Sequence, residues 1–297
     1  MNSNKTSLLA SKISPIEKLN FKGFEFFVKR DDLLGKINGN KARKLDFYLS
    51  QNYPKNQHFI SYGGAQSNAL AALSIFAKNK GYKLTYICSK IPRFLKQNPS
   101  GNYAQALKNG VDFIETLNPL KEFALSLKKE NDIFIEQGIA NLNAEQGYKK
   151  LAKEIQSQSE ILNLSFDIFL PSGTGTSAAF LAKNLPAHQI YTCACVGDKN
   201  YLKAQIKALL PEFKFLNLNI LKSDKKYHFA KPYKEFYELF IELKKECEIE
   251  FDLLYDILGL KIALKHKWQK PLLYIHQGGI LGNETMLSRY TYKRLIN

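Results

Sequence analysis

Short apolar segments alternate with longer segments of helical periodicity through most of the chain. Apolar segments rich in β-branched and aromatic residues predict strands at 58–62, 83–88, 112–116, 132–136, 167–170, 189–196 and 272–275. Apolar residues that recur every three to four positions predict helices at 67–80, 102–109, 119–129, 144–158, 178–184, 234–246 and 257–268. This alternation favours an α/β protein with parallel sheets covered by helices.

The length and hydropathy of the chain limit its class. With 297 residues, one or two domains are expected. No apolar segment reaches the roughly 18 residues that a membrane-spanning helix needs. Residues 1–15 also lack the apolar core of a signal peptide. We therefore expect a cytoplasmic protein without a membrane partner.

The charge is strongly positive, with 43 Lys and Arg against 27 Asp and Glu and a net charge of +16. Such an excess is found in nucleic-acid binders. Here the basic residues are scattered, and the densest clusters are pairs such as Lys225-Lys226. We expect no nucleic-acid partner, and instead a Lys-rich surface with some attraction for anionic small molecules.

The four cysteines are too dispersed for a metal site. None of them forms a Cys-x-x-Cys pair, and Cys193-x-Cys195 lies inside an apolar segment. We expect no metal and no disulfide framework. Buried free thiols in a reducing compartment fit this pattern.

The segment Ser-Gly-Thr-Gly-Thr-Ser at 172–177 follows a predicted strand and opens a helix. Gly173 and Gly175 allow a ligand to approach the backbone closely, and the helix N-terminus offers free N–H groups to an anion. The hydroxyls of Thr174 and Thr176 add hydrogen-bonding capacity. The segment lacks the Gly-Lys-[Ser/Thr] ending of a P-loop. A tight turn with capping hydroxyls is the alternative interpretation.

Two further strand ends carry small or polar residues. Tyr-Gly-Gly-Ala-Gln-Ser-Asn at 62–68 also leads from a strand into a helix. Taken alone, Ser67 is an N-cap, and the neighbouring Asn68 offers an amide to a ligand. His-Gln-Gly-Gly at 276–279 is read as a turn after a strand, with His276 in a structural role.

Lysines near the start of an N-terminal helix suggest covalent chemistry. Lys-Arg-Asp-Asp-Leu at 29–33 is followed by Gly-Asn-Lys-Ala-Arg-Lys-Leu at 39–45. A helix start disfavours a cation, so Lys41 is expected to have a lowered pKa and to be free to form a Schiff base. Lys44 lies one turn further on the same face. A basic surface segment is the alternative interpretation.

Together these motifs resemble, in order and spacing, the fold type II pyridoxal-phosphate (PLP) enzymes, the tryptophan-synthase-β-like group. The closest resemblance is to the 1-aminocyclopropane-1-carboxylate (ACC) deaminase and D-cysteine desulfhydrase family, over about residues 29–283. It implies an α/β fold of two domains, with open parallel-rich sheets flanked by helices. The large PLP-binding domain would comprise 1–45 and 153–297, and the small domain 46–152.

The resemblance also implies roles for individual residues. Lys41 would hold PLP as an internal aldimine and move protons, with Ser67 and Tyr255 as further catalytic residues. The residues implied in binding PLP are Lys41, Lys44, Asn68, Gly173, Thr174, Gly175, Thr176 and Asp256. Those implied in binding the substrate are Gln66, Ser67, Asn68, Tyr233 and Gln277.

Three positions depart from the family pattern. Asn38 replaces a glycine, and because Asn tolerates a left-handed backbone better than most residues, we expect the turn to be kept. Asp256 stands where the deaminases have Glu and the D-cysteine enzymes Thr. Gln277 replaces Leu or Thr respectively.

The expected activity is that of a PLP-dependent lyase or deaminase in amino-acid metabolism. D-cysteine desulfhydrase activity, yielding pyruvate, ammonia and sulfide, is preferred. Hydrolytic ACC deamination is the alternative, and a homodimer is expected. A non-catalytic nucleotide- or anion-binding regulatory protein is the alternative from another class, and it would not need Lys41.

Overall fold

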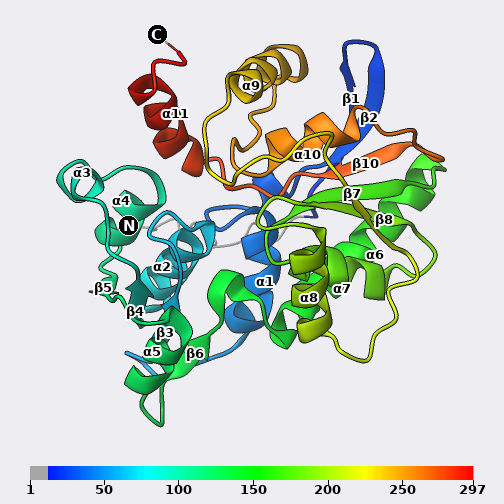
Figure 1. The fold of residues 1–297 in the computed structure, drawn as a ribbon. Helices are drawn as coiled ribbons and strands as arrows, with labels where there is room; N and C mark the ends of the chain where they lie inside the picture. The colour runs from blue at the N-terminus through cyan, green and yellow to red at the C-terminus, as the bar shows by residue number, and fades with distance from the viewer. Residues whose placement is uncertain (1–12, 297) are drawn as a thin grey trace, which may run out of the picture.

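The computed structural model describes residues 13–296 and contains two open sheets with helices packed around them (Figure 1). The larger sheet has six strands in the order β1 (Ile16–Phe21), β2 (Phe24–Lys29), β10 (Leu272–Ile275), β7 (Asp167–Ser172), β8 (Ile190–Ala194) and β9 (Leu218–Leu221). The smaller sheet has four strands in the order β5 (Asp112–Glu115), β4 (Lys83–Cys88), β3 (His58–Tyr62) and β6 (Ile133–Ile135).

All strand pairs are parallel except β1 and β2, which form an antiparallel hairpin at the edge of the larger sheet. The hairpin turns at Lys22 and Gly23, whose φ angles of 51° and 83° are both left-handed. A two-residue turn with this backbone matches the right-handed twist of the flanking strands.

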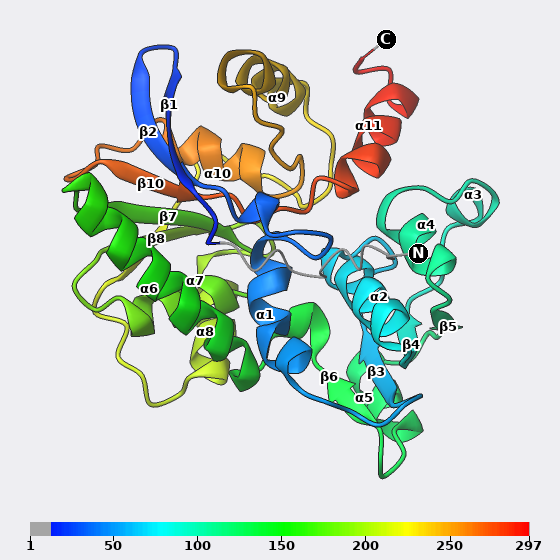
Figure 2. The same ribbon diagram turned by 180° about the vertical axis from the view of Figure 1, so that it is seen from behind.

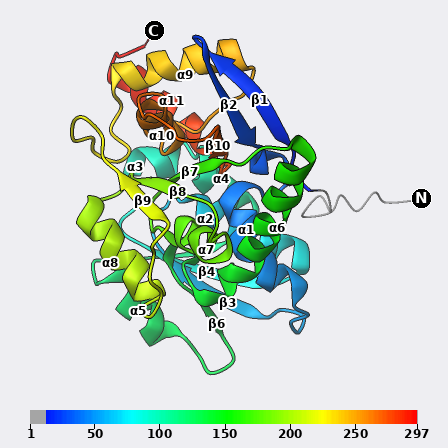
Figure 3. The ribbon, with the colours of Figure 1, turned by 90° about the vertical axis from the view of Figure 1, so that its right-hand side faces the viewer.

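Helices cover both faces of the larger sheet (Figures 2 and 3). One face packs on α9 (Lys234–Cys247), α10 (Asp256–Ala263) and α11 (Gly282–Tyr292), with Phe169 and Tyr274 of the strands in the shared core. The other face packs on α6 (Glu145–Leu162), α7 (Thr176–Asn184) and α8 (Lys199–Leu209). Strands covered on both faces are apolar throughout, as the sequence of β7 and β8 is.

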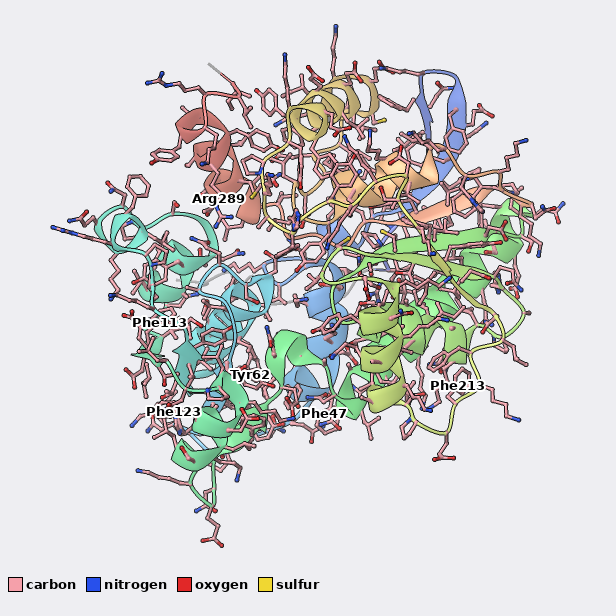
Figure 4. All side chains as sticks on the ribbon, viewed as in Figure 1. Phe47, Tyr62, Phe113, Phe123, Phe213 and Arg289 are labelled. Atoms are coloured by element: carbon pink, nitrogen blue, oxygen red, sulfur yellow. The ribbon has the colours of Figure 1, made fainter. Side chains whose placement is uncertain are left out.

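The smaller sheet distributes its side chains by strand alternation. Phe59 and Leu84 pack towards α2 (Asn68–Lys80), whereas Ile60 and Ile87 pack towards α5 (Leu120–Leu127). Figure 4 shows Tyr62, Phe113 and Phe123 grouped around this sheet, with Phe213 on the far side of the molecule. The remaining elements are α3 (Arg93–Gln97), α4 (Gly101–Lys108) and the short 3-10 helices η1 (Asp31–Leu33), η2 (Gln137–Ile139) and η3 (Leu142–Ala144).

Helix α1 (Gly39–Ser50) lies between the two sheets (Figure 1). Its Arg43 is 6% exposed and pairs with two carboxylates, 2.7 Å from Asp31 in η1 and 2.7 Å from Glu154 in α6. Lys29, at the end of β2, is fully buried and lies 2.9 Å from the same Glu154. The basic motif therefore fixes α1 inside the protein, which corrects the alternative of a basic surface segment.

The predicted domain limits fall inside helices, at 45/46 within α1 and at 152/153 within α6. These limits stay a prediction. Residues 1–12 and 297, which the prediction assigned to the large domain, lie outside the described residues.

The predicted strands and helices are confirmed, with the same limits for β3, β4 and β10. Helix α10 was predicted to reach residue 268 but ends at Ala263, because the indole Nε1 of Trp268 donates to the Ala263 carbonyl at 2.9 Å. The elements that the periodicity did not predict are β1, β2, β9, α3, α8 and α11.

Two predictions about composition can be compared with the described residues. Cys88, Cys193, Cys195 and Cys247 are all buried and free, as expected. Within residues 13–296, no helix combines the length and the apolar character needed to cross a membrane.

The crossing of α1 and α6 generates the first testable prediction. A Cβ at Gly147 of α6 would lie 1.9 Å from the carbonyl oxygen of Arg43. We expect Gly147→Ala to lower the free energy of unfolding by about 3 kcal/mol, since overpacking against a backbone forces the helices apart. Urea unfolding measures this loss.

Gly64→Ala is the control for this prediction, because a Cβ there meets nothing within 4 Å and φ is not positive. We expect its stability to change by less than about 1 kcal/mol. Equal stability of the two variants would contradict the close helix crossing.

Candidate active site

The carboxyl ends of strands from both sheets meet near the start of α1. A Cβ at Gly39, the first residue of α1, would lie 1.7 Å from the carbonyl oxygen of Gln277, which follows β10. A Cβ at Gly138, after β6, would lie 3.4 Å from Cγ2 of Thr174, after β7. Ligands of open α/β sheets bind at such carboxyl ends.

The turn before α1 differs from the expectation for Asn38. Asn38 is extended, with φ of −131° and ψ of 177°, so the replacement of glycine needs no left-handed backbone there. The left-handed residue is Gly39, with φ of +58°. The conformation together with the contact to Gln277 explains why a glycine is required at position 39.

Lys41 lies in the first turn of α1 and is partly exposed. Its Nζ donates to Oδ1 of Asn40 at 3.1 Å. Burial of the amine by surrounding protein atoms lowers the pKa of Lys41 to about 8, while the negative charge of Asp252 raises it. The predicted direction of the pKa shift is confirmed, but its main cause is burial rather than the helix start.

Lys44 is 2% exposed, and its Nζ donates to the carbonyl oxygen of Gly138 at 3.0 Å. Burial lowers the pKa of Lys44 well below its ordinary value, and the charge of Lys41 lowers it further. Because Gly138 lies against Thr174, Lys44 sits beside the loop that was predicted to hold an anion.

The loop between β7 and α7 has the features of an anion site. The backbone N–H groups of Gly173, Thr174 and Gly175 donate to no other described residue. The Thr174 and Thr176 hydroxyls lie 2.8 Å apart. Free N–H groups at the start of a nine-residue helix attract an anion.

The two glycines of this loop are required for different reasons. Gly175 has φ of +74°, and a Cβ there would lie 2.5 Å from Cγ1 of Ile206 in α8. A Cβ at Gly173 would lie 3.3 Å from the ring of Tyr255. The turn is thus shaped by its neighbours, while its N–H groups stay available.

Ser67 is the N-cap of α2, and its Oγ accepts the Ala69 N–H at 3.1 Å. The preceding Gln66 uses both ends of its amide, donating to Ser100 O at 3.2 Å and accepting from Tyr103 N at 3.4 Å. In the structure Gln66 therefore connects the loop before α2 to α4, and its role in substrate binding stays a prediction.

Asn68 is oriented by a neighbour that the sequence did not reveal. Asn102 of α4 is 1% exposed and donates from Nδ2 to Asn68 Oδ1 at 2.7 Å and to Gln66 O at 2.9 Å. This leaves Asn68 Nδ2 as a donor beside Gly279, where a Cβ would lie only 2.4 Å away. The arrangement provides an amide donor near the carboxyl end of β10.

Tyr255 precedes α10 and packs its ring against Gly173. Burial raises the pKa of the Tyr255 hydroxyl above its ordinary range, with the negative charge of Asp252 adding to the shift. The ring of Phe229 lies 5.1 Å from that of Tyr255. Tyr233, the residue singled out in this segment, instead packs on Tyr227, with ring centroids 5.0 Å apart.

Asp256 is buried, and both of its oxygens accept hydrogen bonds. Tyr274 donates its hydroxyl to Oδ1 at 2.8 Å, and the Asp252 N–H donates to Oδ2 at 3.1 Å. Burial raises the pKa of Asp256 to about 7. These bonds hold the carboxyl group among β10 and the residues before α10; contact with a cofactor ring stays a prediction.

The amide of Gln277 is also used within the protein. Its Nε2 donates to Pro171 O at 2.6 Å, and its Oε1 accepts from Nδ2 of Asn40 at 3.2 Å. Because Asn40 also accepts from Lys41, these contacts connect β7, β10 and the lysine.

His276 is fully buried in the structural role that was expected. Its Nδ1 accepts the Gly278 N–H at 3.1 Å, so Nε2 carries the proton and donates to Glu250 O at 2.9 Å. Burial lowers the pKa of His276, which keeps the ring neutral.

These groups fit a phosphate-bearing aldehyde cofactor. The residues that would hold it are the free N–H groups of 173–175 for an anion, the Asn68 amide as a donor, and Lys41 as an amine whose lowered pKa favours attack on a carbonyl. Asp252, Asn102 and Phe229 were not identified from the sequence. Asp252 stands three residues before Tyr255, a spacing that marks a helix cap.

No family model matches the chain, and no curated protein matches it. Among solved structures, an ACC deaminase homologue is 23% identical, with a TM-score of 0.76 over 98% of this chain and 96% of that one. A hydrogen sulfide-producing enzyme from Fusobacterium nucleatum is 16% identical, with a TM-score of 0.63 over 92% and 99%.

A threonine deaminase from the organism abbreviated T.th. is 17% identical, with a TM-score of 0.64 over 90% of this chain and 92% of that one. At these identities the comparisons establish the fold. The predicted fold type II architecture, with parallel-rich sheets flanked by helices, is confirmed.

The buried acid pair gives a prediction about pH. Burial raises the pKa of Asp256 to about 7, whereas the unfolded chain ionises near its ordinary value of 3.8. Between these values the folded protein binds more protons, so stability falls as the pH rises from about 4 to 7. Asp256→Asn should make this fall less steep by on the order of 1 kcal/mol.

Urea unfolding at several pH values measures this slope. The variant also loses one hydrogen bond, which lowers its stability at every pH, so the slope rather than the absolute value is compared. An unchanged slope would show that Asp256 is ionised in the folded protein throughout this range.

Proposed function

We propose that the chain is a PLP-dependent enzyme that acts on a small amino acid, and that Lys41 binds the cofactor covalently. The observation that carries this proposal is the amine of Lys41, partly exposed and with its pKa lowered to about 8. A substantial fraction of such an amine is uncharged near neutral pH and can attack a carbonyl carbon. The free N–H groups at 173–175 support a phosphate site in the same protein.

PLP, when bound, supplies an electron sink that makes bonds at Cα and Cβ of an amino acid easier to break. The N-terminus of α7 binds the phosphate through its free N–H groups. An anion beside Lys44 favours the charged form of that lysine, which offsets the effect of burial. Asn68 donates from Nδ2 to the phenolic oxygen, with Asn102 fixing its amide orientation.

For the reaction, we propose that D-cysteine and water yield pyruvate, ammonia and hydrogen sulfide by β-elimination. Lys41 takes the proton from Cα, Ser67 orients the substrate from the start of α2, and Tyr255 packs beside it. The bonds that Asp256 accepts from Tyr274 and Asp252 support this choice, because they direct its carboxyl group into the fold. A carboxylate aimed at the cofactor's ring nitrogen would instead deepen the electron sink.

ACC deamination is the second candidate. It is favoured by the ACC deaminase homologue, which has the higher TM-score of 0.76 against 0.63 for the sulfide-producing enzyme. Cytoplasmic location and a homodimeric state belong to the same proposal and stay predictions.

The cofactor assignment can be tested by absorbance. Wild-type protein incubated with PLP and then freed of excess cofactor should be yellow, whereas Lys41→Ala should lose most of the visible absorbance. Lys36→Ala, an exposed lysine in the same segment, is the matched control and should remain yellow. Retained absorbance in Lys41→Ala would refute the assignment of this lysine.

The substrate choice requires a panel of D- and L-amino acids with ACC. We expect sulfide and pyruvate from D-cysteine, and ACC turnover lower by at least roughly tenfold, since an apolar ring leaves the polar groups of the site unpaired. Efficient ACC turnover without action on D-cysteine would reverse this choice. Turnover of neither by PLP-loaded protein would exclude both substrates.

A further inference from the structure

Asp252 is a buried carboxylate with one oxygen fully used and one left over. It is 2% exposed and precedes α10. Its Oδ1 accepts the N–H groups of Leu254 at 2.8 Å, Tyr255 at 2.5 Å and Asp256 at 3.3 Å, which makes it the cap of that helix. Its Oδ2 accepts no hydrogen bond from any residue within 13–296.

The free oxygen lies among the groups of the candidate site. A Cβ built on Gly279 would lie 2.9 Å from Asp252 Oδ2 and 2.4 Å from Asn68 Nδ2, so the oxygen and the amide converge on one glycine. Lys41 is close enough to feel this carboxylate, since the charge of Asp252 raises the pKa of the Lys41 amine. A capping function alone requires only Oδ1.

We propose that Asp252 is a positioning residue whose free Oδ2 acts as the counter-charge of the Lys41 amine. In this role it holds the amine in place as an ammonium before the cofactor arrives, and it accepts a proton when the amine is needed as a nucleophile. The inference goes beyond the proposed function, because it concerns the protein before any cofactor is bound.

Asp256, four residues away, provides an internal comparison. It is also a buried carboxyl group, but both of its oxygens accept hydrogen bonds from Tyr274 and from the Asp252 backbone. Its charge is not among those that shift the pKa of Lys41. The two aspartates therefore differ in whether an oxygen is free to act on the lysine.

The other titratable groups around Asp252 are accounted for. They are Lys41 and Lys44 of α1, Tyr255 and Asp256 at α10, Cys195 after β8 and His276 after β10. The pKa values of Tyr255 and Cys195 are raised and that of His276 is lowered, so all three are neutral near pH 7. Burial raises the pKa of Asp252 to about 7, so this carboxyl group is ionised over the range in which Lys41 titrates. Asp252 is then the anion that acts on Lys41.

The test measures Lys41 in the full-length protein without PLP. The apoprotein is treated briefly with acetic anhydride at a series of pH values, and modification of the Lys41 peptide is followed by mass spectrometry. Asp252→Asn keeps an oxygen for the helix cap but removes the charge. We expect its labelling profile to shift to lower pH by roughly one unit, as for the loss of one nearby opposite charge.

Asp256→Asn is the matched control, and its profile should coincide with that of the wild type. No shift in Asp252→Asn, or equal shifts in the two variants, would overturn the proposal. If Asp252→Asn does not fold, Asp252→Ser provides a shorter capping oxygen without charge and should show the same shift. Because no cofactor is present, failure of the PLP proposal would leave this result unaffected.

Discussion

The paired charges of Arg43 hold the helix on which the rest of the candidate site depends. This guanidinium is buried between Asp31 and Glu154, and removing either partner would leave an uncompensated charge inside the protein, at a cost of about 3–5 kcal/mol. The three residues come from η1, α1 and α6, so one interaction fixes α1 in both position and rotation. Lys41 and Lys44 stand on that helix within two residues of Arg43.

From this fixed helix, the site is completed by close backbone contacts rather than by side-chain packing. Gly39 meets the carbonyl of Gln277, so the start of α1 and the end of β10 approach as closely as two chains can. Gln277 then reaches Pro171 at the end of β7 through its own amide. Segments far apart in the sequence are thereby held at one place, where Lys41 is partly buried and its pKa falls to about 8.

Periodicity predicted the buried strands and the long helices, because these elements show their environment locally. It missed the β1–β2 hairpin and α8, which depend on a Lys22-Gly23 turn and on the Asp198 cap, and such short signals are weak in one sequence. The motif residues Lys41, Ser67 and Tyr255 were identified by resemblance. Asn102 and Asp252 were not, since their importance arises from contacts with Asn68 and Gly279 across the fold.

Lys41 and Lys44 are both embedded lysines with lowered pKa values, three residues apart, and the account depends on which of them reacts. Lys44 is bound to the Gly138 carbonyl, whereas Lys41 is partly exposed. The most direct measurement is borohydride reduction of the PLP-loaded protein followed by peptide mapping. The account predicts the reduced cofactor on Lys41 alone; a label on Lys44, or on no lysine of α1, would contradict it.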